Sequence, residues 1–334
     1  MNKKTVILLS ALISMLWLIS ACAPAVQPQV EPTEVPATAE PTIAEPTEPP
    51  TAEPEMEAIT ITDDLGIELT LDGPAQAIIS ISPSLTEILF GVGAGDRLIG
   101  RDSNSNYPEE ALAAQDLGGM WDGIPVEDIL AMQPDLILAG EIYSAEAVAE
   151  LRDLGLTVYW QANPDDFEGL YDNIMDIALL TGMEDQAEAL VGELSSQVAL
   201  VDEKLSSVDQ LPLVFYELDA SEPANPWTAG SGTFISYVIS RAKGQNLGDS
   251  LEGEWVQISS EALVAQDPDV ILLADELYGI TAESVADRPG WGEITAVLEG
   301  QIYGFDPFIL SVPGPRLVDG YQELSRILHP EVWE

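Results

Sequence analysis

One stretch of this sequence occurs twice, and the duplication limits the folds that the chain can adopt. Each copy contains a Trp, a Glu six residues later and a Pro-Asp pair seven residues after the Glu. The copies are Trp121, Glu127 and Pro134-Asp135, and Trp255, Glu261 and Pro268-Asp269. Such a repeated spacing predicts two similar lobes in one chain, each built around one copy.

Each copy predicts a short helix that leads into a buried strand. A glutamate suits the positive N-terminal end of a helix dipole. The residue before a proline disfavours helical geometry, so we expect the two helices to end near Gln133 and Asp267. A short, nearly all-apolar run follows each Pro-Asp pair, as is typical of a buried parallel strand. The Trp of each copy is expected on the loop in front of its helix.

Strands and helices alternate along the folded part of the chain, which begins with a predicted edge hairpin at Ile59 to Leu71. The other predicted strands are Ala77 to Ser82, Arg97 to Gly100, Leu156 to Trp160, Leu213 to Leu218 and Gln301 to Phe305. The predicted helices are Ser84 to Gly91, with a capping box from Ser84 to Glu87, Ala145 to Leu154, Thr233 to Lys243 and Pro315 to Leu328. This alternation predicts an α/β fold with mostly parallel sheets.

A long amphipathic helix is predicted between the two halves. Apolar residues from Ala187 to Leu205 recur at spacings of three, four and seven, which places them on one face of a helix from about Glu184 to Ser206. We therefore expect two Rossmann-like lobes, at residues 58–180 and 209–334, joined by one long bridging helix within residues 181–208.

The N-terminus has the features of an export signal. Lys3 and Lys4 precede the apolar run Val6 to Leu18, which is too short for an ordinary membrane-spanning helix. Small residues then precede Cys22, the only cysteine. The pattern resembles a bacterial lipoprotein signal, so we expect residues 1–21 to be removed and Cys22 to be lipidated. The alternative is an ordinary secretory signal with an incidental cysteine.

Residues 22–57 are rich in Pro, Glu and Thr and contain no Lys or Arg. Such a segment buries no core, and its prolines and like charges keep it extended at about 3.1 Å per residue. We interpret it as a tether that holds a folded body away from a membrane. The expected localisation is exported, lipid-anchored to a cell membrane and facing the periplasm or the cell exterior.

The charge balance argues against one class of partner. Lys and Arg number 11 against 58 Asp and Glu, a formal net charge of -47. Nucleic-acid binding needs clustered Lys and Arg, so no nucleic-acid partner is expected. Most of the acidic excess is interpreted as a solvated surface.

Several further motifs are distributed over both predicted lobes. They are Ile81-Ser-Pro-Ser-Leu-Thr-Glu87, Thr228-Ala-Gly-Ser-Gly232, Pro289-Gly290-Trp291 with Ala296-Val297 and Gly300, and Gly314-Pro315-Arg316. Together with the duplicated unit, they resemble the periplasmic solute-binding proteins of ABC importers for cobalamin and ferric siderophores, the type whose lobes are bridged by one long helix. The resemblance extends from about Ala77 to the C-terminus. It implies a monomer that captures a small ligand between its lobes and delivers it to a permease dimer with its ATPase.

The resemblance also implies a role for the duplicated glutamates. In such proteins one Glu of each lobe docks onto arginines of the permease, and by motif position these are Glu127 and Glu261. The repeat supports this role independently, because a symmetric two-subunit permease needs a symmetric pair of contacts. The alternative is that both residues only stabilise a helix dipole.

Seven residues are expected to contact the ligand. Three are tryptophans on loops at the ends of strands, where open α/β sheets bind ligands and where indoles would pack against a flat ring system. The polar candidates lie on a loop where relatives often have Tyr, or where the family often has polar ligand contacts. The seven are Trp121, Trp227, Trp255, Asn104, Asn106, Asp306 and Arg316. For Arg316 a structural salt bridge is an equal alternative to an anion contact, and Trp291 is expected to be structural.

A catalytic set is absent from the sequence, so we expect a binding protein and not an enzyme. The only histidine is His329, and no Gly-x-Ser-x-Gly motif is present. No His/Cys cluster with metal-ligand spacing occurs, so a metal is expected only inside the bound ligand, with no other cofactor. The predicted ligand is cobalamin or a related corrinoid. The alternatives are a ferric siderophore, a surface-anchored hydrolase and a binding module that serves a sensor.

Overall fold

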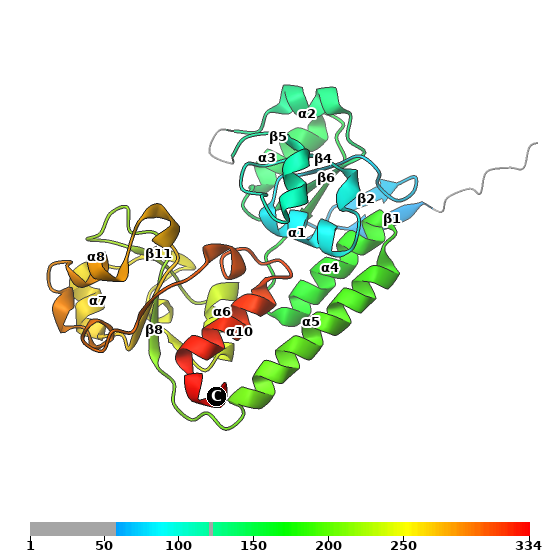
Figure 1. Ribbon diagram of the computed structural model, residues 1–334. Coiled ribbons are helices and arrows are strands. Elements are labelled where there is room, and N and C mark those ends of the chain that lie inside the picture. The colour runs from blue at the N-terminus through cyan, green and yellow to red at the C-terminus, as the bar shows by residue number, and fades with distance from the viewer. Residues whose placement is uncertain (1–57, 120–122) are drawn as a thin grey trace, which may run out of the picture. The chain divides into compact units, whose positions relative to one another are not determined.

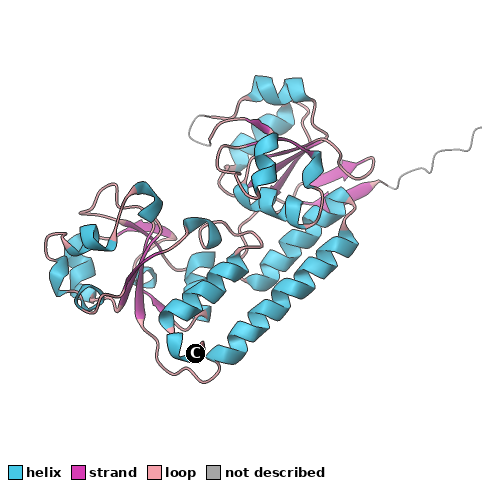
Figure 2. Ribbon diagram, viewed as in Figure 1, coloured by secondary structure: helices cyan, strands magenta, loops and turns pink. Residues whose placement is uncertain are grey.

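The computed structural model describes residues 58–119 and 123–334, which belong to one compact unit (Figure 1). The predicted signal and tether, Cys22 and Trp121 lie outside the described residues. We refer to residues 58–180 as the N-terminal lobe and to residues 209–334 as the C-terminal lobe. Figure 2 shows that strands gather in each lobe and that helices surround them.

The N-terminal lobe contains a five-stranded parallel sheet with the strand order β5-β4-β3-β6-β7. Its strands are β3 (Ile78–Ser80), β4 (Leu98–Arg101), β5 (Gln115–Asp116), β6 (Leu136–Gly140) and β7 (Val158–Gln161). Its helices are α1 (Pro83–Gly91), α2 (Val126–Met132), α3 (Ala145–Asp153) and α4 (Phe167–Thr181). Every residue of β3 and β6 is buried, as the near-continuous apolar runs predict.

The predicted edge hairpin is confirmed as the antiparallel pair β1 (Ile59–Thr62) and β2 (Glu68–Leu71). The buried carboxylate of Asp63 holds its turn, because Asp63 Oδ1 accepts the backbone N–H groups of Leu65 and Ile67 at 3.0 and 2.9 Å. Asp63 also forms an ion pair with Arg152, which ties the hairpin to α3.

The C-terminal lobe contains a four-stranded parallel sheet with the order β10-β8-β12-β13. Its strands are β8 (Leu213–Glu217), β10 (Gln245–Asn246), β12 (Val270–Leu273) and β13 (Ile302–Gly304). Its helices are α6 (Phe234–Arg241), α7 (Ser260–Gln266), α8 (Ala282–Ala286), α9 (Thr295–Leu298) and α10 (Leu317–Leu328). The two sheets confirm the expected α/β class with mostly parallel strands.

The long helix predicted between the lobes is α5 (Glu184–Leu205). Its buried face contains Ala187, Leu194, Val198, Val201 and Leu205, in agreement with the apolar spacing in the sequence. The helix beside it, α4, is absent from the predicted elements. Asp166 caps α4 by accepting the N–H of Gly169 at 2.8 Å, and Gly182 ends it in the left-handed conformation at φ 66°.

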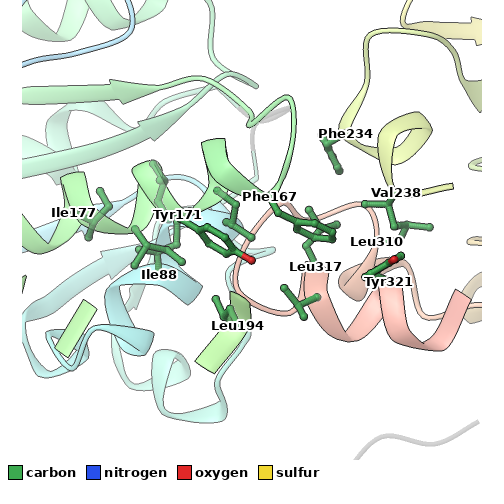
Figure 3. Packing of buried hydrophobic residues seen from close by; sticks show 14 of the residues in the cluster. Ile88, Phe167, Tyr171, Ile177, Leu194, Phe234, Val238, Leu310, Leu317 and Tyr321 are labelled. Carbon is green, nitrogen blue, oxygen red and sulfur yellow. The ribbon is translucent and has the colours of Figure 1, made fainter. Parts of the chain in front are cut away.

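One apolar core continues from lobe to lobe. The same cluster contains Tyr171 of α4, Leu194 of α5 and Leu317 of α10 (Figure 3). The ring of Phe167 contacts the rings of Tyr237 on α6 and Tyr321 on α10, with centroid distances of 5.5 and 5.3 Å. The lobes are therefore packed against each other and against α5, in addition to being connected by the chain.

The duplicated unit has the same local structure in both copies. Helices α2 and α7 have seven residues each and are followed by the C-cap residues Gln133 and Asp267, which have left-handed φ values of 51° and 50°. The next Asp in each copy holds the start of the neighbouring strand. Asp135 accepts the N–H groups of Gln76 and Ala77 at 2.8 and 3.0 Å, and Asp269 accepts that of Leu213 at 2.7 Å. In both copies the prediction of a short helix that ends before the Pro-Asp pair and leads into a buried strand is confirmed.

Two local predictions are wrong. The first is the capping box from Ser84 to Glu87. Helix α1 begins at Pro83 and has Ser82 as its N-cap, without a side-chain capping bond, and Glu87 is buried instead of closing a box. The second is the assignment of Trp227 and Trp255 to loops. They lie on β9 (Trp227–Ala229) and β11 (Trp255–Gln257), which pair as a two-stranded antiparallel ribbon.

Candidate ligand-binding site

The loops that follow β4 and β13 meet, one from each lobe. The guanidinium carbon of Arg316 lies 3.8 Å from the centroid of the Tyr107 ring. Arg316 also donates to Glu87 Oε1, from Nε at 3.1 Å and from Nη2 at 2.5 Å. Because parallel strands end at the same edge of their sheet, these contacts bring the carboxyl edges of both sheets to one junction. Open α/β sheets bind ligands at this edge.

A cavity of about 470 Å³ lies at the junction. It is lined by Phe90 and Tyr107 of the N-terminal lobe, Leu190 and Leu194 of α5, and Arg316 and Asp319 of the C-terminal lobe. Small-molecule sites commonly enclose roughly 300–1,000 Å³. The volume of this cavity falls within that range.

The tryptophans at positions 227 and 255 share one face of the β9–β11 ribbon. In the antiparallel register Trp227 pairs with Gln257, and Trp255 pairs with Ala229. Cross-strand partners and residues two positions apart point to the same side, so both indoles are on that side. They are 38% and 42% exposed, and Trp255 packs edge-on against Phe234 at 6.2 Å between ring centroids. The ribbon thus presents two aromatic surfaces, whereas Trp121 lies outside the described residues.

The two candidate asparagines are exposed on a loop that is anchored by the buried side chain of Asp102. Asp102 is buried and accepts the N–H of Asn104 at 2.8 Å and the hydroxyl of Ser105 at 2.5 Å. Thr86 Oγ1 lies 3.0 Å from Ser105 Oγ and connects the loop to the end of β3. Burial raises the pKa of Asp102 above its ordinary value, and the hydrogen bonds from Ser105 and Asn104 oppose this rise. Asn104 and Asn106 are therefore presented by a well-anchored loop.

Asp306 and Arg316 both have internal partners. Asp306 is exposed, and its carboxylate accepts the N–H of Phe308 at 2.9 Å, capping the turn at Pro307–Ile309. Arg316 pairs with Glu87, which corresponds to the salt-bridge alternative for this residue. Glu87 was missed from the sequence as a residue of the junction. The available signal was that Glu87 is the one charged residue of α1.

The seven arginines of the chain all lie within the described residues, and each has an internal partner. Arg97 donates to the carbonyl oxygens of Ala75 and Thr181. The others form ion pairs, which are Arg101–Asp116, Arg152–Asp63, Arg241–Asp202, Arg288–Glu217, Arg316–Glu87 and Arg326–Glu323. In the described part of the chain, therefore, no guanidinium is left unpaired to receive an anionic ligand.

Exposed apolar side chains also follow β6 and β12, which are interior strands of the two sheets. Ile142, just after β6, is 52% exposed, and Leu277 and Tyr278, just after β12, are 64% and 84% exposed. Tyr107 is 45% exposed at the same edge of the N-terminal sheet. The sequence prediction did not include these residues, although apolar residues directly after a buried strand provided a signal. They extend the apolar surface at the sheet edges beyond the two tryptophans.

The duplicated glutamates occupy matching places away from the junction. Glu127 is the second residue of α2 and Glu261 is the second residue of α7, and both are exposed. Figure 1 shows α2 and α7 each on the side of its own lobe that is remote from α5. Each glutamate is thus available to a partner on the outside of the molecule.

Three further observations concern the chemistry of the described residues. Within 58–119 and 123–334, no group of three or more His, Cys, Asp and Glu is arranged to hold a metal ion. No helix of that same part combines the length and apolar character needed to cross a membrane. His329 is buried, with Nε2 3.3 Å from the carbonyl oxygen of Lys243, and Trp291 is fully buried against Phe215, as expected for a structural tryptophan.

Comparison with known proteins identifies the family to which this architecture belongs. The family model described as periplasmic binding protein matches residues 78–307. The ABC transporter substrate-binding lipoprotein YvrC of Bacillus subtilis is 32% identical over 285 residues, covering 84% of this chain and 88% of that protein.

Two solved structures have the same fold. The vitamin B12 binding protein BtuF of Vibrio cholerae has a TM-score of 0.67 and 27% identity, over 76% of this chain and 97% of that one. The heme-binding protein RhuT of Roseiflexus sp. RS-1 has a TM-score of 0.69 and 24% identity, over 77% and 99%, and this likeness concerns the fold alone. The chain belongs to the periplasmic binding protein family, whose members are non-enzymatic components of transport.

Proposed function

We propose that the chain is the substrate-binding lipoprotein of an ABC importer and that it binds cobalamin or a related corrinoid between its lobes. The observation that carries the ligand assignment is the pair of half-exposed indoles, Trp227 and Trp255, on one face of the β9–β11 ribbon. A flat macrocycle packs well against such rings.

The charges around the junction favour a ligand without strong negative charge. The chain has a formal charge of -47, and every arginine already has an internal partner in the described structure. A corrinoid carries amide side chains around its ring, and neutral groups such as the side chains of Asn104 and Asn106 can hydrogen-bond to amides. Haem has two propionates and a catecholate siderophore is multiply anionic, so both would need guanidinium groups that are engaged elsewhere.

Two of the comparisons support this proposal. One of the solved structures with 27% identity is a vitamin B12 binding protein, and the relative with 32% identity is a substrate-binding lipoprotein. By the same likeness we propose that Cys22 carries the lipid, that residues 22–57 are the tether, and that the exported protein serves a permease and its ATPase. Glu127 and Glu261 are the proposed docking residues.

Calorimetric titration of the chain from Ala23 onward, which lacks the lipidated cysteine, tests the proposal. The probes are cyanocobalamin, hemin, a ferric hydroxamate and a ferric catecholate. We expect saturable binding of cyanocobalamin at one site, with a dissociation constant on the order of 1 μM or lower. Hemin and the ferric catecholate, which are anionic, should bind more weakly or not at all. Tight binding of an iron chelate without binding of cyanocobalamin would overturn the corrinoid assignment and retain the binding role. If the chain binds none of the four probes, the proposed class of ligand is wrong.

A further inference from the structure

One ion pair at the junction connects the two lobes directly. Glu87 lies on α1 of the N-terminal lobe, and Arg316 lies immediately before α10 of the C-terminal lobe. Among the salt bridges of the described residues, this is the one whose partners come from different lobes. The side chains of Glu87 and Arg316 are only 3% and 16% exposed.

Tyr107 packs against Arg316, and Gly314 packs against Glu87. The ring of Tyr107 covers the guanidinium group of Arg316. On the other side, Gly314 packs against Glu87 so closely that a Cβ atom at this position would lie 2.9 Å from Glu87 Oε2. The Gly-Pro-Arg motif therefore combines a close backbone approach to Glu87 with an arginine that pairs with the same carboxylate.

Separation of the lobes at this point would break a buried pair. If a substitution removes one partner, the other charge stays buried without its partner, which is strongly unfavourable. The pair lies at the cavity together with Leu190 and Leu194 of α5. It therefore adds a charged contact to the apolar contact that Phe167 makes with Tyr237 and Tyr321.

We propose that the Glu87–Arg316 pair, covered by Tyr107, is a latch that fixes the spacing between the lobes and thereby shapes the ligand site. Glu87 and Arg316 are then positioning residues, and Arg316 stays paired with Glu87 when ligand is bound. The effect on ligand affinity rests on the proposed function, whereas the spacing of the lobes is a property of the chain without ligand.

Distance measurement between spin labels tests the latch without any ligand. The chain from Ala23 onward has no cysteine, so Glu150→Cys on α3 and Glu283→Cys on α8 provide two exposed labelling sites, one on each lobe. We expect one narrow distance distribution in the parent chain, and a broader or shifted one after Arg316→Met or Glu87→Leu. Glu87→Gln, which preserves the volume of the side chain, should give an intermediate result. The control is Arg326→Met, which breaks the exposed Glu323 pair within one lobe and should leave the distribution unchanged. Unchanged distributions in Arg316→Met and Glu87→Leu would overturn the latch.

Affinity for cyanocobalamin separates a positioning role from a ligand contact. If Arg316 contacted the ligand, removal of Glu87 would free its guanidinium, and Glu87→Leu would bind as tightly as the parent or more tightly. The latch predicts the opposite, at least a tenfold loss of affinity in Glu87→Leu as well as in Arg316→Met. Undiminished affinity in Glu87→Leu would overturn the positioning role. If the parent chain itself fails to bind cyanocobalamin, the ligand proposal fails, and the label distances still decide whether the latch exists.

Discussion

Glu127 and Glu261 occupy the same structural position, although 134 residues separate them in the sequence. Each is the exposed second residue of a seven-residue helix that ends in a left-handed residue before a Pro-Asp pair. The environments of the two carboxylates are therefore matched by the fold. A partner built from two like subunits would meet two equivalent acidic contacts.

We predict that exchanging both glutamates for arginine abolishes delivery without weakening ligand binding. The substitutions Glu127→Arg and Glu261→Arg place positive charges against the positive surface proposed for the permease, and like-charge contacts suppress association. Uptake by cells and ligand-stimulated ATPase activity of the reconstituted importer should fall to background. Affinity for the ligand, measured on the isolated protein, should stay within twofold of the parent, on the order of 0.4 kcal/mol or less.

The chain offers a matched control for this pair. Glu146 and Glu283 are the exposed second residues of α3 and α8, one on each lobe. Their exchange for arginine changes the net charge by the same amount and should preserve transport. Equal loss of transport in the control pair would show that overall charge matters, and not the two docking positions.

Phe167 is predicted to be the main apolar contact between the lobes. It is 3% exposed and lies between Tyr237 and Tyr321 of the C-terminal lobe. Phe167→Ala should lower the free energy of unfolding by about 3–5 kcal/mol, as is typical for loss of a buried aromatic ring. Urea denaturation measures this value. Leu154→Ala, at a side chain 51% exposed, is the control and should change it by less than about 0.5 kcal/mol.

Because of three carboxylates that are buried or partly buried, we predict that the stability of the fold increases as the pH is lowered. Burial raises the pKa of Asp102, Asp176 and Asp275 above their ordinary values. An acid whose pKa is higher in the folded state binds more protons there, so its contribution to stability rises as pH falls through the window between the unfolded and folded pKa values. We therefore expect the melting temperature to rise as the pH is lowered toward the ordinary pKa of an aspartate, about 3.9.

The substitution Asp102→Asn separates this effect from the general loss of negative charge. It keeps the shape of the side chain and removes the titrating group, so the melting temperature should depend less steeply on pH than in the parent chain. Exposed Asp128→Asn is the control and should preserve the slope. A slope in Asp102→Asn equal to that of the parent would refute the role assigned to Asp102.

The features that the sequence predicted well are local. The Pro-Asp pairs, the spacing of apolar residues on α5 and the runs that became β6 and β12 are each determined by neighbours along the chain. Their physical causes, which are proline geometry, helical periodicity and strand burial, act within a few residues. The family resemblance then gave the arrangement of the elements.

The features that were missed depend on partners far apart in the sequence. Glu87 and Arg316 are 229 residues apart, so no local pattern connects them, and the spacing from Ser84 to Glu87 imitates a capping box. The ribbon of Trp227 and Trp255 pairs two strands of three residues each, too short for an alternating pattern to be visible. The residues of the junction therefore became apparent only in the folded chain.

The affinity of a double variant, Trp227→Leu with Trp255→Leu, tests whether the ligand packs against the β9–β11 ribbon. Calorimetry with cyanocobalamin should give at least a tenfold weaker dissociation constant than the parent chain, about 1.4 kcal/mol or more. Trp333→Leu, at a tryptophan that packs between Lys204 and Arg326, should bind like the parent. If the double variant binds cyanocobalamin as tightly as the parent, the ligand does not lie on this ribbon, and Trp227 and Trp255 are not ligand-binding residues.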